Sequence, residues 1–145
     1  MKKADFYILA GADEESRQQF LGKLLSRIMR TELQVYLYCA DQFSAQKLSE
    51  RLWEFQATSF LANRLINESH SARICLGWPE QHQPPHRQVI INLTDQIPDD
   101  AAQFERIAEI VTQQPDSLVA SRERYKRYRT EGYEIQHNDM RPKQQ

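Results

Sequence analysis

The stretch Gln88-Val89-Ile90-Ile91-Asn92-Leu93 predicts a fully buried β-strand, because four of its six residues are apolar and three of these are β-branched. Similar short apolar runs occur along the chain. Several of the segments between them carry apolar residues at spacings of three and four, which is typical of amphipathic helices. Strands that are apolar throughout pair in parallel, because the helices that connect them cover the faces of the sheet. The sequence therefore predicts an α/β fold, a single-domain three-layer sandwich with a mostly parallel sheet.

The other elements are expected on both sides of this strand. Residues 104–111 allow two interpretations, since their apolar spacing fits a helix, whereas the β-branched Ile107, Ile110 and Val111 favour a strand. We favour the strand. Further strands are expected at 6–9, 34–39 and 74–76, and helices at 14–30, from Asp41 to about Trp53, and at about 117–130, before Gly132.

The length of 145 residues and a hydrophobic content of 40% indicate one soluble globular domain with a single core. We expect this domain at residues 1–135, followed by a polar tail at residues 136–145 that frays. Met1-Lys2-Lys3 leads directly into a strand, and no apolar stretch reaches the ~20 residues that a bilayer span needs. The chain is therefore expected to be cytoplasmic, without a membrane partner. Cys39 and Cys75 are expected to be buried and unpaired.

The turn after the first predicted strand lacks the glycines that a nucleotide site requires. In Ala10-Gly11-Ala12-Asp13-Glu14-Glu15, one glycine precedes three acidic residues, which repel phosphate. His82 and His86 flank two prolines without a completing cysteine or acidic cluster, so we expect solvated loop histidines rather than a metal site. No nucleophile elbow or other catalytic arrangement is evident. The sequence therefore predicts a docking module without cofactor or metal, rather than an enzyme.

A basic segment, Arg122-Glu123-Arg124-Tyr125-Lys126-Arg127-Tyr128-Arg129, lies near the end of a chain whose net charge is −1. At about 100° per residue, one helical face carries Arg122, Tyr125, Lys126 and Arg129 together with Leu118, and other faces carry Arg124, Arg127 and Tyr128. Because the first face combines three cations with a ring, it suits an anionic ligand with an apolar end better than duplex DNA. The alternative is that these cations only complement the helix dipole.

Large aromatic side chains surround the expected end of the second helix. Core packing accounts for Phe55, whereas Trp53 and Phe60 adjoin polar residues of a short connector. Rings in such positions are either core residues or anchors for a partner protein. From the residues alone, both interpretations remain open.

The RERYK..YR pattern of residues 122–129 is followed by Gly132-Tyr133, and this combination is more specific than any of the strands. The other informative segments are Phe6-Tyr7, residues 35–39, Leu52-Trp53 with Phe60, and residues 87–93. Together they resemble, over almost the whole chain, the chi subunit family of bacterial DNA polymerase III holoenzyme. The resemblance implies a nucleotide-binding-like α/β fold without a nucleotide site and a non-catalytic accessory role in DNA replication. It also implies two partners, the psi subunit of the clamp loader and the acidic C-terminal tail of single-stranded DNA-binding protein (SSB).

The resemblance further implies roles for individual residues in binding the SSB tail, which carries aspartates and ends in a proline and a phenylalanine. Arg122 would pair with the terminal carboxylate, and Tyr125 would contact the phenyl ring. Lys126 and Arg129 would meet the aspartates, and Ile135 would complete the pocket.

Trp53 and Phe60 match the positions through which family members bind psi and, in some cases, an XPD-like helicase. Direct binding to DNA is not expected. Two other functions stay open on the residues alone. One is a module that binds single-stranded nucleic acid through the basic helix, and the other is a degenerate hydrolase that binds phosphate at the Gly11 turn.

One feature departs from the family pattern. Members can carry a lysine about one turn before the first arginine of the motif, where this chain has Leu118, Val119 and Ala120. The acidic tail then meets one cation fewer, so a lower affinity is expected. Arg141 and Lys143 are the candidates to compensate.

Overall fold

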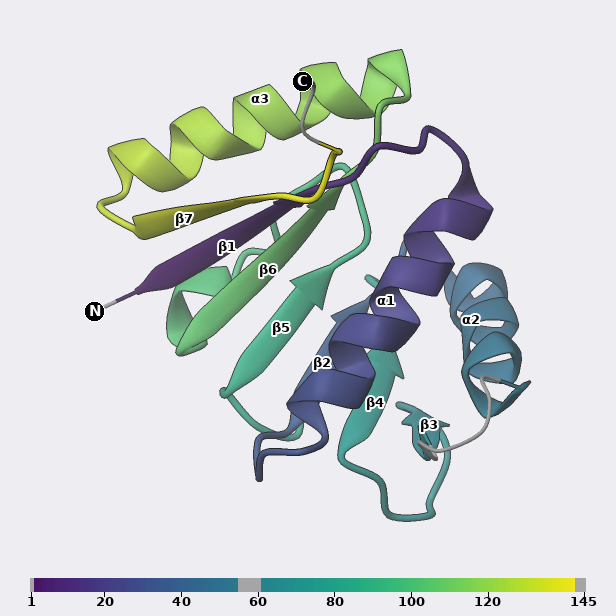
Figure 1. Cartoon of the computed structure of the whole chain (residues 1–145). Helices are drawn as coiled ribbons and strands as arrows, with labels where there is room; N and C mark the ends of the chain where they lie inside the picture. Colours follow the sequence, from purple (N-terminus) through teal and green to yellow (C-terminus); the bar gives the residue numbers. More distant parts are fainter. Residues whose placement is uncertain (1, 55–60, 143–145) are drawn as a thin grey trace.

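A computed structural model describes residues 2–54 and 61–142. Its strands are β1 (Lys3–Ile8), β2 (Val35–Tyr38), β3 (Asn63–Leu65), β4 (Ile74–Gly77), β5 (Val89–Asn92), β6 (Arg106–Val111) and β7 (Glu134–Asp139). Its helices are α1 (Glu14–Ile28), α2 (Gln42–Glu54) and α3 (Pro115–Thr130), with a short 3₁₀ helix, η1 (Ala101–Gln103), before β6. Within these residues, all strands pair in parallel in one sheet of order β3-β4-β2-β5-β6-β1-β7 (Figure 1).

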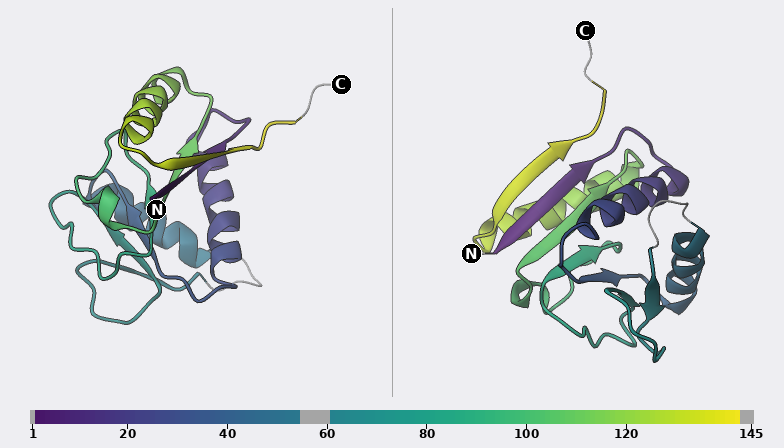
Figure 2. Two further views of the ribbon diagram at one scale, coloured as in Figure 1. Left: turned by 90° about the vertical axis from the view of Figure 1, so that its left-hand side faces the viewer. Right: turned by 60° about the horizontal axis from the view of Figure 1, so that its bottom comes forward.

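Helices cover both faces of this sheet (Figure 1, Figure 2). α1 and α2 lie on one face, where their leucines pack with Leu37 of β2 and Ile91 of β5. α3 lies on the other face, where Tyr128 packs with Tyr36 and Ile90. Alternate residues of the central strands thus enter opposite cores, and the predicted three-layer sandwich is confirmed.

The turn from β1 into α1 is closed by the chain's own side chains. The Asp13 carboxylate accepts a hydrogen bond from the Ser16 backbone N–H at 3.3 Å and so caps the helix. A Cβ atom on Gly11 would lie 2.6 Å from the Ser16 hydroxyl oxygen, so this turn requires a residue without a side chain. Glu14 and Glu15 complete an acidic first turn. A phosphate at this helix end would meet three carboxylates.

The preference for a strand over a helix at residues 104–111 is confirmed by β6. β6 pairs in parallel with β5 on one side and with β1 on the other. Ile107 and Val111 enter the core beneath α3, whereas Ala108 and Ile110 enter the opposite core. Because the strand is buried on both faces, it lacks the polar alternation that marks a half-exposed strand.

The C-terminal region differs from the expectations at two points. α3 begins at Pro115 rather than Ser117, because the Gln114 side chain accepts a hydrogen bond from the Ser117 backbone N–H at 2.7 Å and acts as the N-cap. The chain does not fray after Ile135, because β7 pairs with β1 as far as Asp139. The edge of β1 satisfies the backbone hydrogen bonds of a segment whose side chains are polar.

His82 is not the solvated loop residue that the sequence suggested. Its Nε2 atom lies 2.7 Å from Asp100 Oδ1, and its Nδ1 atom lies 3.1 Å from the Tyr36 hydroxyl oxygen. His86 is also half-buried, and burial lowers the pKa of its imidazole. The contacts of His82 join the loop after β4 to β2 and to the residue before η1. They depend on the tertiary arrangement, so the local sequence does not reveal them.

Candidate functional site

One side of α3 is buried, and it carries a charged side chain. The Arg124 Nε atom donates a hydrogen bond to Glu109 Oε1 of β6 at 3.0 Å, and the Tyr128 hydroxyl donates to Glu109 Oε2 at 2.7 Å. The Asn92 side-chain amide of β5 donates to the same Oε2 atom at 3.0 Å. Burial raises the pKa of Glu109, whereas the Arg124 charge and these three hydrogen bonds favour its ionised form.

This buried network determines how α3 is rotated about its axis. Turning the helix would separate Arg124 from Glu109 and leave a buried carboxylate without its cation, which is costly. With Arg124 held inward, the side chains of Arg122, Lys126 and Arg129 are exposed. Helical spacing had placed Arg124 on a different side from these three cations, in agreement with the structure.

Tyr125 lies between the buried and the exposed sides of α3 and is half-buried. Its ring centroid is 5.8 Å from that of Phe6 of β1 and 5.2 Å from that of His137 of β7. Ile135 of β7 is also half-buried and packs against the same core. Tyr125, Ile135 and His137 are therefore called the α3–β7 shelf, because α3 runs along β7 at this edge of the sheet (Figure 1).

The register of β7 explains why Ile135 and His137 belong to one surface. Ile135 is paired with Ala4 and His137 with Phe6, and both partners lie in the core beneath α3. Since side chains two residues apart share a face of a sheet, Ile135 and His137 both face α3. The family resemblance implied Ile135 but not His137. His137 reaches this surface through the pairing of β7 with β1, and no local signal in the mostly polar segment indicates it.

The exposed cations differ in how far other side chains neutralise them. Lys126 Nζ lies 3.7 Å from Glu123 Oε1, and both side chains are largely exposed. Arg127, on another side of α3, pairs with Glu131 at 3.2 Å. Within the described part of the chain, Arg122 and Arg129 have no ion-pair partner.

In the region where other members of the family can carry a lysine, this chain has Leu118, Val119 and Ala120. Leu118 is half-buried and packs against the core beneath α3. Arg141 donates to Asp139, with 2.7 Å between Nη2 and Oδ2, and these hydrogen bonds lower the pKa of Asp139 to about 2. The charge of Arg141 is therefore matched by a neighbouring carboxylate. Lys143 lies outside the described residues.

Trp53 lies in the last turn of α2, and 55% of its surface is exposed. A second aromatic residue, Phe43, is 67% exposed at the start of the same helix. At this exposure Trp53 is not a core residue, which was one of the two interpretations left open by the sequence. Phe55 and Phe60 lie outside the described residues.

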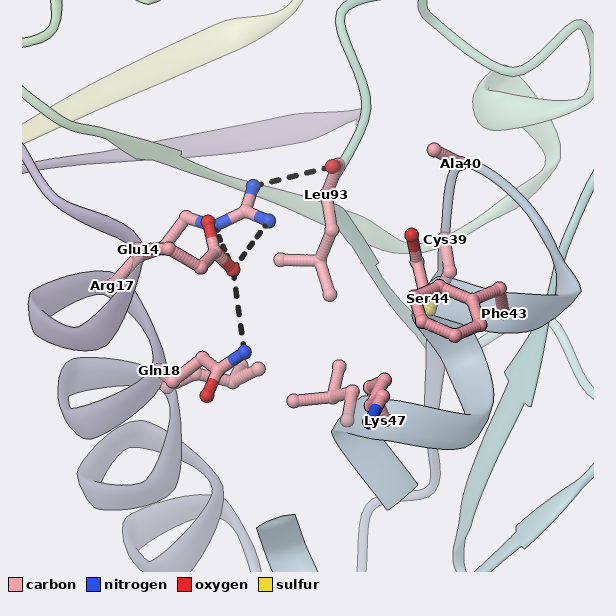
Figure 3. Close-up of a pocket in the computed structure, with 11 residues that line it drawn as sticks. Glu14, Arg17, Gln18, Cys39, Ala40, Phe43, Ser44, Lys47 and Leu93 are labelled. Atoms are coloured by element: carbon pink, nitrogen blue, oxygen red, sulfur yellow. Dashed lines mark hydrogen bonds and ion pairs between the residues drawn. The ribbon is translucent and has the colours of Figure 1, made fainter. Parts of the chain in front are cut away.

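A hollow of about 280 Å³ opens between the N-terminal halves of α1 and α2 (Figure 3). Its lining mixes apolar side chains with polar and charged ones, among them Lys47 and Arg17. Arg17 donates to Glu14 and to the Leu93 carbonyl oxygen. None of the cations on the exposed side of α3 lines the hollow. Among the described residues, no three or more metal-binding side chains cluster together, and no helix is long and apolar enough to cross a bilayer.

Comparison with known proteins gives consistent matches over nearly the whole chain. Residues 1–136 match the family described as "DNA polymerase III chi subunit, HolC". A protein named DNA polymerase III subunit chi from Pseudomonas aeruginosa is 37% identical over 138 residues, which are 94% of this chain and 95% of that protein. Proteins of the same name from Escherichia coli and Haemophilus influenzae are each 28% identical, over 141 and 136 residues. These matches cover 93% and 92% of this chain and 96% and 94% of the relatives.

Proposed function

The chain belongs to the DNA polymerase III chi subunit family, and from this we propose that it links the clamp loader to SSB during DNA replication. In this role it acts as a non-catalytic accessory subunit in the cytoplasm. It binds the psi subunit of the clamp loader through one surface and the acidic C-terminal tail of SSB through another. The polymerase thereby holds on to a template strand that SSB covers.

The observation that carries the proposal for SSB is the exposed side of α3 next to the α3–β7 shelf. Arg122 and Arg129 are exposed cations without ion-pair partners in the described residues, and Tyr125 offers a half-buried ring beside them. An acidic peptide that ends in phenylalanine needs cations for its carboxylates and an apolar surface for its ring. Both requirements are met within about two turns of a single helix.

In the proposed complex, Arg122 pairs with the terminal carboxylate, and the phenyl ring packs against Tyr125 and Ile135. Lys126 and Arg129 attract the aspartates upstream. One anchored carboxylate, one packed ring and a few screened charges give an affinity in the micromolar range, about −8 kcal/mol. Binding weakens at high salt, because the exposed charges are screened.

The proposed psi-binding surface is centred on Trp53, which is the exposed anchor at the end of α2. Phe60 belongs to this proposal by its match to the family pattern alone. An XPD-like helicase is a second candidate for the same surface. Trp53 belongs to α2, on the face of the sheet opposite α3, so psi and the SSB tail bind without competing.

The experiment is a titration with two ligands. A synthetic peptide that ends in Asp-Ile-Pro-Phe with a free carboxylate is titrated by calorimetry, and a single-stranded oligonucleotide is titrated by fluorescence anisotropy. Micromolar binding of the peptide, with much weaker binding of the oligonucleotide, supports the proposal. The reverse order would favour a direct nucleic-acid-binding module that uses the same basic helix.

A further inference from the structure

His137 is an exposed residue of β7 that holds a defined position in the α3–β7 shelf. Its ring centroid lies 5.2 Å from that of Tyr125 and 6.0 Å from that of Phe6, so two rings fix the side on which the imidazole lies. The register of β7 with β1 supports the same placement, because His137 is paired with Phe6. A ligand that packs against Tyr125 therefore also meets the imidazole.

The charged groups around His137 favour an anionic ligand. On α3, the exposed cations Arg122, Lys126 and Arg129 lie on the side that carries Tyr125. On β7, Asp139 shares the face of His137, but its carboxylate is bound by Arg141. This bond holds the pKa of Asp139 at about 2, so the aspartate keeps its charge throughout the range in which histidines titrate.

The remaining charged neighbours lie at the opposite face of the sheet. A hollow there is lined by the charged residues Lys3, Asp5, Arg106 and Glu134, and His137 also lines it. Asp5 is buried and pairs with Arg106 at 3.0 Å. Lys3 and Glu134 are exposed and opposite in sign. These four side chains therefore contribute no net charge beside the imidazole.

We propose that His137 is a further residue of the tail-binding site, and this inference rests on the proposed function. Its ring extends the aromatic surface beside Tyr125, and its protonated form adds a cation for the carboxylates of the peptide. Histidine side chains change charge between about pH 5 and pH 8, whereas the carboxylates of the peptide stay ionised there. Affinity for the acidic tail therefore rises as the pH falls through this range.

The test measures the affinity for a histidine-free peptide that ends in Asp-Ile-Pro-Phe at about pH 5.5 and about pH 7.5. The unmodified protein is expected to bind about two- to fivefold more tightly at the lower pH, the effect of one solvent-exposed ion pair. His137→Gln is expected to abolish this difference in affinity between the two pH values and to weaken binding at the lower pH. His137→Lys keeps a cation at both pH values, so its affinity is high at both.

The matched control is His70→Gln, at the strand edge farthest from β7, where His70 Nε2 lies 2.8 Å from the Asn63 carbonyl oxygen. This variant is expected to show the same ratio of peptide affinities at the two pH values as the unmodified protein. This inference would be overturned if His137→Gln still bound the peptide more tightly at the lower pH, or if the unmodified protein bound equally at both pH values. Either result would leave the proposed function intact. Absence of peptide binding at both pH values would overturn both. Circular dichroism confirms that each variant is folded.

Discussion

Arg124 of α3 and Glu109 of β6 form an ion pair whose side chains are only 8% and 0% exposed, with 3.0 Å between Nε and Oε1. In the sequence, Arg124 lies between two exposed residues, Arg122 and Lys126, within one five-residue stretch. Residues of the same short motif therefore lie on two different sides of α3. Its inward residues hold the helix on the sheet, and its outward residues are available to a ligand.

Replacing Arg124 with alanine is expected to lower the free energy of unfolding by about 3 kcal/mol, because removing one partner of a buried ion pair leaves a buried carboxylate without its cation. Urea denaturation, followed by circular dichroism, measures this loss. Replacing both Arg124 and Glu109 with apolar residues of similar size is expected to recover part of it.

Arg127→Ala serves as the matched control for stability. Arg127 lies on the same helix, but its pair with Glu131 is exposed, with 61% and 40% of the two side chains accessible. The expected loss is below about 1 kcal/mol. Equal losses in the Arg124 and Arg127 variants would show that the buried pair does not stabilise α3.

The α/β class, the parallel sheet and the exposed side of α3 were predictable from the sequence, because they follow from local apolar runs and helical spacing. The buried network was not. Glu109 lies between the apolar pairs Ile107-Ala108 and Ile110-Val111 of β6, and its partner Arg124 is identified only when β6 and α3 are packed together. The same limit applies to His82, whose partners Tyr36 and Asp100 are distant in sequence.

β7 shows a second limit of prediction from sequence. Residues Glu134–Asp139 are mostly polar and exposed, so hydrophobic periodicity gives little sign of a strand. The strand forms because β1 offers a free edge, a property of the assembled sheet. The position of His137 in the α3–β7 shelf follows from that pairing and could not be inferred before it.

Arg122→Ala and Tyr125→Ala are each expected to weaken binding of the SSB tail peptide by tenfold or more. The first removes the partner of the terminal carboxylate, and the second removes the ring against which the phenyl group packs. Isothermal titration calorimetry measures both affinities. Arg127→Ala removes a cation from another side of the helix and should leave the affinity nearly unchanged. Unchanged affinity in folded Arg122 and Tyr125 variants would rule out this face as the tail-binding site.

Trp53→Ala is expected to weaken binding of psi by tenfold or more, because a large exposed ring at the centre of an interface commonly dominates its affinity. Affinity for the SSB tail peptide should not change in this variant. Phe43→Ala provides the comparison, since it removes a ring that is even more exposed from the other end of α2. Should psi bind the Trp53 variant as tightly as the unmodified protein, the proposed psi surface would be wrong.

Leu118→Lys is expected to tighten binding of the SSB tail peptide by about two- to fivefold, the range for one exposed ion pair. Leu118 precedes Arg122 by one turn, so a lysine there restores the cation that other members of the family can carry. Its aliphatic stem can follow the apolar surface that Leu118 covers while its charge reaches solvent. The gain should disappear at high salt, and calorimetry at two salt concentrations measures this.

Val119→Lys adds the same charge at an exposed position about 100° further around the helix and should have a smaller effect. Equal gains in both variants would mean that the peptide responds to the net charge of α3 rather than to a defined site.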